Sequence, residues 1–320
     1  MFALSASVAC APSSTGASGA ADPAGSSYPE RTIEVVVPYP AGGGSDVLAR
    51  ALVEAVNSDG GLGADMQIVN RAGGAGVAGT SEVLSAQADG YTIGFGPEGP
   101  VTLAPAVEDV PYDALAMTPL LQVTESLPIL AVPGDSPYRS LQDLVDAALA
   151  SPGQISMGEG PLSYAVPVTL LERNSGAEFN RIDYEGDAAS LTALLGGNVD
   201  ATITQVAAVL PQVESGGVRV LGILGEQRSE FLPEVPTVQE EGFDVVWSVA
   251  YFLYGPDGLP ENVLDALVEA FGSAAESETF EQVAQTAGLS IELTGAEELE
   301  SYLSDRTAMA KELAEQNGGL

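Results

Sequence analysis

The sequence predicts an α/β protein of two lobes, with mostly parallel sheets flanked by helices. The chain has 320 residues, which is long for a single hydrophobic core. Hydrophobic residues make up 45% of it, enough for well-packed interiors. Short runs rich in β-branched residues alternate with segments of helical periodicity. That alternation is typical of parallel strands covered by helices.

The alternation begins at the strand-like run IEVVV, which precedes a helical segment over residues 45–56. Apolar spacing predicts that one face of this helix packs on the sheet through Val47, Leu48, Ala51, Leu52 and Ala55. A second strand-like run, MQIV, leads through a glycine-rich turn into the helical segment ending SEVLSAQ. The next strand, YTIGFG, follows the turn made by Asp89 and Gly90.

The same pattern continues through the rest of the chain. Strand-like runs read ILAVP, QISMG, FNRIDY and VRVLGIL. Between them lie helical segments around SLQDLVDAALA, PVTLLERNSG and SLTALLGG. Lys311 falls in a predicted C-terminal helix.

The charge balance excludes several kinds of partner. Asp and Glu number 45 against 10 Lys and Arg, which gives a formal net charge of −35. A surface this acidic repels nucleic acid and anionic lipid, and no basic patch offsets it, so no nucleic-acid partner is expected. Two interpretations of the acidity stay open: a salt-loving source, or an extracellular surface tuned for solubility, of which the second is favoured.

Several chemistries lack the residues they require. The chain has no histidine, which excludes imidazole catalysis and histidine-ligated metal sites. Its single lysine, Lys311, is far in sequence from the glycine-rich turns, so no phosphate-binding P-loop can form. The one cysteine cannot form an internal disulfide. Most familiar hydrolytic and phosphoryl-transfer machinery is therefore absent, and no catalytic residue, metal site or cofactor is predicted.

The N-terminal segment resembles a bacterial lipoprotein signal. The short apolar stretch MFALSASVAC ends in small residues before Cys10, and a glycine- and serine-rich tether follows. Residues 1–29 are accordingly predicted to be a signal remnant and flexible tether, with Cys10 as the lipidated residue and the only attachment to the membrane. A truncated start and an incidental cysteine are the alternatives. No other stretch reaches the roughly 18 apolar residues of a membrane span.

Two glycine-rich turns, PAGGGSD and RAGGAGVAGT, each connect a predicted strand to a predicted helix. Glycines allow backbone N–H groups at a positive helix end to approach an anion. Gly74, Gly76 and Gly79 also spell G-x-G-x-x-G, a dinucleotide fingerprint, and Glu98 follows the next strand. The dinucleotide interpretation is disfavoured, because the preceding strand is not the first of its unit.

Six motifs carry a family resemblance in the same order: VVVPYPAGGGSDVLAR, VNRAGGAGVAGTSEV, ADGYTIGFG, VPYD, DYEGDAASLTALLGGNVDA and LPEVPTVQEEGFDV. Over residues 30–320 the chain resembles the substrate-binding proteins of tripartite tricarboxylate transporters, also called Bug-type receptors. The resemblance implies a periplasmic-binding-protein fold of the Venus-flytrap type, with crossings near PILAVPG and VAYFLYGP. It places lobe one at residues 30–129 plus 251–320 and lobe two at 130–250.

The resemblance also implies a ligand pocket between the lobes. From lobe one the pocket is expected to include Tyr39, Ala41, Gly42, Gly43, Gly44, Ser45, Asp46, Gly73, Gly74, Ala75, Gly96, Pro97 and Glu98. From lobe two it is expected to include Gly158, Glu159, Gly160, Ser163, Tyr164, Tyr184, Asp187, Thr204 and Gln205. A structural interpretation is favoured for Asp46, which can hold the glycine loop, and Arg71 and Trp247 are predicted to be a tether and a core residue.

This chain departs from the family pattern at two loops. GPEGP places Glu98 where relatives usually have small hydroxyl residues. GEGPLSYA places Glu159 in the glycine turn, Pro161 where relatives often have Thr, and Tyr164 where they often have His. Two carboxylates near the pocket would repel a polyacid, so the expected ligand is not citrate. It carries one carboxylate with an amine or other donor, or is an aromatic acid of low charge. In the alternative interpretation both glutamates point to solvent.

The resemblance implies a monomeric, extracytoplasmic receptor, on the cell surface or in the periplasm. It would capture a small organic acid and pass it to the membrane permease subunits of a tripartite transporter, without cofactor or chemistry. Two other function classes stay open: a ligand-sensing subunit for a signalling partner, and an enzyme that uses paired carboxylates.

Overall fold

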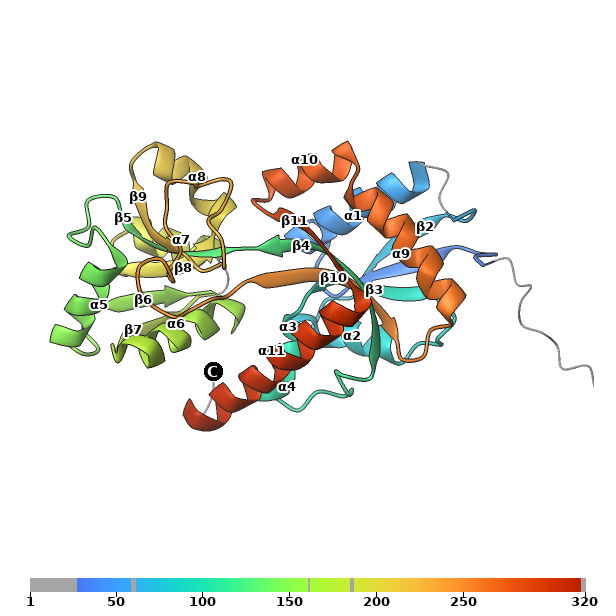
Figure 1. The fold of residues 1–320 in the computed structure, drawn as a ribbon, viewed down its shortest axis with the longest axis horizontal. Coiled ribbons are helices and arrows are strands. Elements are labelled where there is room, and N and C mark those ends of the chain that lie inside the picture. The colour runs from blue at the N-terminus through green and yellow to red at the C-terminus, as the bar shows by residue number, and fades with distance from the viewer. Residues whose placement is uncertain (1–27, 59–61, 161, 185–186, 318–320) are drawn as a thin grey trace, which may run out of the picture.

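The computed structural model describes residues 28–58, 62–160, 162–184 and 187–317. Cys10 and all but the last two residues of the predicted tether lie outside these ranges. The chain forms two lobes, each a mixed β-sheet flanked by helices (Figure 1). Within the described ranges, no helix is both long and apolar enough to cross a membrane.

The first lobe contains a six-stranded sheet in the order β11-β4-β10-β3-β1-β2. Its strands are β1 (Ile33–Val37), β2 (Met66–Asn70), β3 (Thr92–Pro97), β4 (Met117–Ser126), β10 (Val249–Pro256) and β11 (Ser290–Gly295). Helices on one or other face of this sheet, or at its edge, are α1 (Gly44–Ser58), η1 (Gly74–Gly76), α2 (Val77–Leu84), α3 (Gly99–Thr102), α4 (Ala104–Val107), α9 (Glu261–Ala275), α10 (Glu278–Thr286) and α11 (Ala296–Asn317). The two glycine-rich turns, PAGGGSD and RAGGAGVAGT, therefore both lie in this lobe.

Helix α1 buries most of its predicted face. Leu48, Ala51, Leu52 and Ala55 belong to the main core cluster, together with residues of β1, β3, α9 and α10. The prediction is wrong for Val47, whose relative exposure is 46%. Val47 lies in the first turn of the helix, beside the glycine loop, where the sheet does not cover it.

The second lobe contains a five-stranded sheet in the order β7-β6-β8-β5-β9. Its strands are β5 (Pro128–Pro133), β6 (Ser156–Glu159), β7 (Asn180–Asp183), β8 (Ala201–Gln205) and β9 (Val218–Ile223). The helices are α5 (Leu141–Ala150), α6 (Leu162–Ser175), α7 (Asp187–Leu195) and α8 (Val206–Glu214). Helix α5 begins with a capping box, in which Ser140 and Asp143 each satisfy a backbone N–H of the other.

Both sheets are mixed and not mostly parallel. Among the described strands, four neighbouring pairs are parallel and five are antiparallel. Every antiparallel pair involves β4, β5 or β10. These strands flank the two points where the chain passes between the sheets, after Ser126 and before Val249. The strand–helix alternation in the sequence predicted the parallel pairs. It did not predict the antiparallel pairs, which are made by the strands beside the two crossings.

The strand register directs the carboxyl ends of the parallel strands toward the junction of the lobes. Pro97, at the end of β3, pairs with Tyr251 near the start of β10. Gln205, at the end of β8, pairs with Pro128 at the start of β5. Because the chain crosses between the lobes just before β5 and β10, the loops that follow β1, β2 and β3 lie opposite those that follow β6, β7 and β8. Loops at such strand ends are the usual place for a ligand in α/β folds.

Helix α11 spans the two lobes (Figure 1). Its C-terminal part packs through Ala310 and Leu313 into a core cluster that contains Val166 of α6 and Trp247. Glu312 forms an ion pair with Arg173 of the second lobe, at 3.6 Å. Trp247 is 1% exposed, which confirms its prediction as a core residue.

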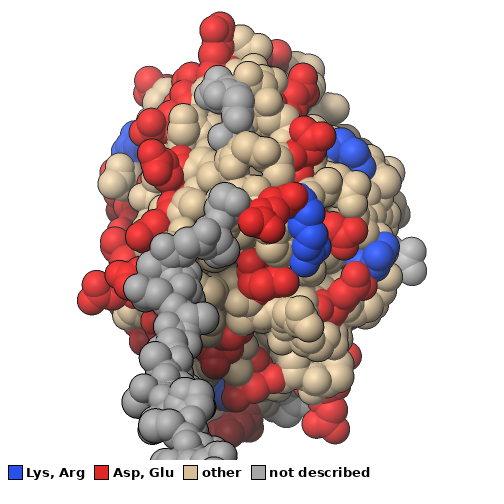
Figure 2. Space-filling model, turned by 90° about the vertical axis from the view of Figure 1, so that its right-hand side faces the viewer, with Lys and Arg blue, Asp and Glu red and all other residues tan. Residues whose placement is uncertain are grey.

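Acidic side chains are spread over the face shown in Figure 2, and basic ones are few. We expect the melting temperature at pH 7.5 to rise when NaCl is increased from ~0.05 M to ~0.5 M, because salt screens repulsion among carboxylates. The same series at pH 4, where more carboxylates are protonated, should give a smaller rise. A melting temperature that does not change with salt at pH 7.5 would contradict this expectation.

Candidate ligand-binding site

Hydrogen bonds within the first glycine loop, PAGGGSD, engage the amides of Gly42 and Gly43 but not those at the start of α1. Gly42 has φ +83°, its N–H donates to Asp46 Oδ2 at 2.8 Å, and the Gly43 N–H donates to the Pro40 carbonyl at 3.3 Å. The first N–H groups of a helix have no acceptor within the helix. Those of Gly44 and Ser45 also donate to no described loop or side-chain atom. These two amides, unlike those of Gly42 and Gly43, therefore lack a described acceptor; Gly44 is exposed and Ser45 is buried.

The Asp46 carboxylate is engaged within the protein. The residue is 2% exposed and accepts hydrogen bonds from Gly42, from Arg50 Nε at 2.9 Å and from Asn70 Nδ2 at 2.9 Å. Burial tends to raise the pKa of this carboxyl, but the three donors outweigh it and hold the pKa below its usual value. This is the loop-holding role predicted for Asp46.

The second glycine loop follows β2 and has an unusual backbone. Positive φ values occur in succession at Gly73, Gly74, Ala75 and Gly76, with Ala75 at φ +48° the one non-glycine residue of the described chain in this region. The N–H groups of Gly76 and Ala78 both donate to the Gly73 carbonyl. Those of Gly74 and Ala75 donate to no described acceptor, and both residues are exposed. The second loop therefore also presents two amides.

Tyr39 joins the two glycine loops. Its hydroxyl donates to the Ala75 carbonyl at 3.2 Å. A Cβ added at Gly76 would lie 3.1 Å from the Tyr39 hydroxyl and 2.5 Å from Pro100, so that only glycine fits between the second loop and its neighbours. Arg71 is tethered to Glu82 by an exposed ion pair at 2.8 Å, as predicted.

The third loop, after β3, contains Gly96, Pro97 and Glu98. Gly96 is buried close to Pro38 and Tyr39. Glu98 is 0% exposed, and its N–H donates to the Ala250 carbonyl of β10 at 3.0 Å. Neither of its carboxyl oxygens has a well-formed hydrogen bond to a described residue.

The surroundings of Glu98 come from distant parts of the chain. Burial raises the pKa of its carboxyl to about 7, Arg306 and the nearby Tyr302 hydroxyl partly oppose this, and Glu125 adds to it. Arg306 lies over the ring of Trp247 at 3.9 Å and donates to the Ser248 carbonyl. A buried acid thus sits where the third loop meets α11 and the crossing segment. The alternative that Glu98 points to solvent is wrong.

The predicted residues of the second lobe lie at the carboxyl ends of β6 and β8, in the loops after β6 and β7, and at the starts of helices α6 and α7. Thr204 is fully buried, and its hydroxyl has no hydrogen-bond partner among the described residues. Asp187 is the first residue of α7, and its side chain lies outside the described part of the structure. The partly exposed members are Gly160, Ser163, Tyr184 and Gln205, and the buried ones are Gly158, Glu159, Tyr164 and Thr204.

Glu159 is paired with a residue that the sequence did not indicate. Arg181, on the neighbouring strand β7, binds both carboxyl oxygens of Glu159 and donates to Thr169 Oγ1 at 2.8 Å. The expectation that Glu159 adds an unbalanced negative charge is therefore wrong, and so is the alternative that it points to solvent, because it is 1% exposed. The parallel register of β6 and β7, which places these residues together, is a tertiary feature.

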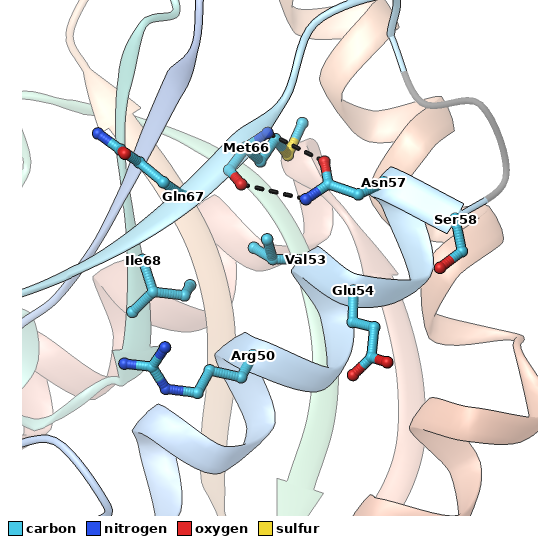
Figure 3. Close-up of a pocket in the computed structure, with 8 residues that line it drawn as sticks. All are labelled: Arg50, Val53, Glu54, Asn57, Ser58, Met66, Gln67 and Ile68. Carbon is cyan, nitrogen blue, oxygen red and sulfur yellow. Dashed lines mark hydrogen bonds between the residues drawn. The ribbon is translucent and has the colours of Figure 1, made fainter.

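A separate groove runs between α1 and β2 (Figure 3). Asn57 closes part of it by binding both backbone groups of Met66, donating to the carbonyl at 3.1 Å and accepting from the N–H at 2.9 Å. Arg50 and Ile68 lie at one end and Ser58 at the other. The lining residues are Arg50, Val53, Glu54, Asn57, Ser58, Met66, Gln67 and Ile68, none of which belongs to the predicted site.

Two mixed sheets, two crossing points and glycine loops at their junction define a two-lobed solute-binding protein. Residues 48–319 match the model of the tripartite tricarboxylate transporter family receptor, and the chain belongs to this family. It is 30% identical over 284 residues to the BugT protein of Bordetella pertussis, covering 87% of this chain and 86% of BugT. It is also 30% identical over 258 residues to a UPF0065 protein of Cupriavidus necator, covering 80% and 78%.

Solved structures show the same fold. A TctC solute-binding protein from Polaromonas superposes with a TM-score of 0.80 at 24% identity, covering 90% of this chain and 99% of that one. The periplasmic binding protein BugD gives 0.73 at 27% identity, covering 91% and 99%. The Rpa4515 protein of R. palustris, solved with adipate, gives 0.76 at 25% identity, covering 91% and 99%. The family is one of periplasmic solute-binding receptors, not of enzymes.

Proposed function

We propose that this protein is an extracytoplasmic receptor that binds a small carboxylate between its lobes and delivers it to the membrane permease of a tripartite transporter. One observation supports this most strongly. Four backbone amides at Gly44, Ser45, Gly74 and Ala75 lack described acceptors, and they lie in neighbouring loops at the carboxyl edge of β1 and β2. Amides at a helix start are suited to an anion.

The four amides can supply a large part of the binding free energy without an arginine. A hydrogen bond from an N–H group to a charged oxygen contributes about 1.5–3 kcal/mol. The positive end of α1 adds roughly 0.3–1 kcal/mol, or ~2 kcal/mol when partly buried. Four such bonds give about 6–12 kcal/mol before the cost of association, which is at least about 4 kcal/mol. Micromolar affinity requires about 8 kcal/mol, so contacts from the second lobe have to supply the remainder.

The ligand class follows from the acids near the junction. Arg181 pairs with Glu159, and also with Glu172, whereas Glu98 has no comparable ion pair among the described residues. Above its pKa of about 7, the single buried acid Glu98 is ionised and still disfavours a tricarboxylate at this place. The Rpa4515 protein was solved with adipate, a dicarboxylate. We propose a ligand with one or two carboxylates and exclude citrate.

The remaining features of the proposal rest on the sequence. We assign lobe one to residues 30–129 with 251–320 and lobe two to 130–250. The protein acts as a monomer, performs no reaction and is held at the membrane by a lipid on Cys10. The pattern of small residues before Cys10 and the flexible tether after it support the anchor.

Calorimetric titration of the full chain tests the function. The panel is adipate, malate, an aromatic monocarboxylate, an amino acid, citrate and a neutral sugar. We expect micromolar binding of at least one mono- or dicarboxylate and no binding of citrate or the sugar. Binding of the sugar with no response to any carboxylate would contradict the proposal, and tight binding of citrate would contradict the ligand class.

A further inference from the structure

We propose that Asn70 and Arg50 are positioning residues for ligand binding, which with Asp46 hold the two glycine loops at a fixed separation. This inference rests on the proposed carboxylate site and adds two residues that do not belong to its predicted lining. Neither residue needs to touch the ligand. Each acts by fixing where the amides of the two loops point.

Asn70 connects the two loops directly. It is the last residue of β2 and precedes Gly73, the first glycine of the second loop, by three positions. Its Nδ2 group donates to the carbonyl of Tyr39 at 3.1 Å and to Asp46 Oδ1 at 2.9 Å, both in or beside the first loop. One amide side chain therefore joins the start of the second loop to both ends of the first.

Arg50 completes the same network from α1. Its Nε donates to Asp46 Oδ2 at 2.9 Å, its Nη2 lies 2.9 Å from Asp46 Oδ1, and Nη2 also donates to Asn70 Oδ1 at 3.2 Å. The pair with Asp46 is asymmetric, since the side chains are 54% and 3% exposed. Arg50 thus neutralises a buried carboxylate that would otherwise repel an anion beside the first loop.

The network explains how an acid can belong to an anion site. Asp46 uses the Gly42 N–H to close the loop, and Arg50 cancels the charge of Asp46. The amides of Gly44 and Ser45, which have no described acceptor, are then held in a fixed loop. Donors that are held in place before the ligand arrives lose less entropy on binding than donors in a mobile loop.

The test compares Asn70→Ala and Arg50→Gln with Arg71→Ala. Arg71 is the matched control, because it follows Asn70 directly but makes an exposed ion pair with Glu82 outside the network. Hydrogen exchange without ligand should be faster at the hydrogen-bonded amides of both loops, those of Gly42, Gly43 and Gly76, in the Asn70 and Arg50 variants, and unchanged there in the control. Adipate affinity should fall about fivefold or more for Asn70→Ala, as expected for lost positioning bonds, and little for the control.

The pH dependence of the affinity distinguishes the loss of charge compensation at Asp46 from the loss of loop geometry. In Arg50→Gln the buried Asp46 loses its partner. The adipate affinity of this variant, relative to that of the wild type, should therefore recover as the pH is lowered and Asp46 takes up a proton. The loss in Asn70→Ala should vary less with pH than the loss in Arg50→Gln, because Arg50 still pairs with Asp46. A general loosening of the fold would not produce this difference between the two variants. Exchange and affinity that match the control in both variants would overturn the inference. If the wild type binds no carboxylate, the proposed function fails, and the exchange of the two loops alone decides whether the network holds them.

Discussion

Valine in place of Gly42 is expected to weaken carboxylate binding by about ten- to hundredfold while the protein stays folded. Gly42 has φ +83°, a region that β-branched residues avoid at a cost of about 1–3 kcal/mol. A Cβ at this position would meet no atom within 4 Å, so the effect is one of backbone shape and not of collision. The loop would relax away from the geometry in which the Gly42 N–H binds Asp46, and the Gly44 and Ser45 amides would turn with it.

Gly63→Val is a closely matched control for this substitution. Gly63 has φ +89°, and an added Cβ would again meet nothing within 4 Å. It lies in the loop before β2, away from both glycine loops. Both variants should therefore lose similar stability in thermal melts, and only Gly42→Val should lose affinity in calorimetry. Equal affinity of the two variants would show that the first loop does not bind the ligand.

Glu98→Gln is expected to stabilise the protein above neutral pH by up to about 3 kcal/mol. The pKa of Glu98 is raised from 4.5 to about 7, chiefly by burial. Between these two pKa values the folded state binds more protons than the unfolded state. The contribution of Glu98 to stability is therefore greatest below pH 4.5 and is lost as the pH rises to about 7. A shift of this size corresponds to about 3 kcal/mol. Glutamine has the shape of the protonated acid and cannot ionise, so it should escape this loss.

The measurement is urea unfolding of both proteins between pH 4.5 and 8.5. The difference between glutamine and glutamate should be small at the lowest pH and reach its full value above pH 7. Using this difference removes the contributions of the other carboxylates, which both proteins share. Glu82→Gln serves as the exposed control, and its difference from the wild type should vary little with pH. A Glu98 difference that is independent of pH would show that this carboxyl is ionised in the folded protein.

Local patterns in the sequence predicted the features that depend on neighbouring residues. The run IEVVV and the apolar spacing after it predicted β1 and α1, and the glycines predicted the two loops that connect strand to helix. The loop-holding role of Asp46 could be predicted because its partner Gly42 is four residues away. Val47 was assigned to the wrong face because periodicity does not show where the sheet stops covering a helix.

Features that depend on distant residues could not be predicted in this way. Arg181 reaches Glu159 only because β6 and β7 pair in parallel register. The surroundings of Glu98 include Arg306, more than two hundred residues away in sequence, which α11 brings to the crossing segment. The mixed sheets have the same origin, since the direction of β5 and β10 is set by the crossings between the lobes.

A crystal structure of the full chain grown with adipate, or with the tightest carboxylate of the calorimetric panel, tests the central claim most directly. The account predicts one ligand carboxylate within hydrogen-bonding distance of the Gly44 and Ser45 amides on one side and the Gly74 and Ala75 amides on the other, with residues of the second lobe covering the remainder. A carboxylate bound instead in the groove between α1 and β2, with the amides of both glycine loops left to solvent, would contradict it.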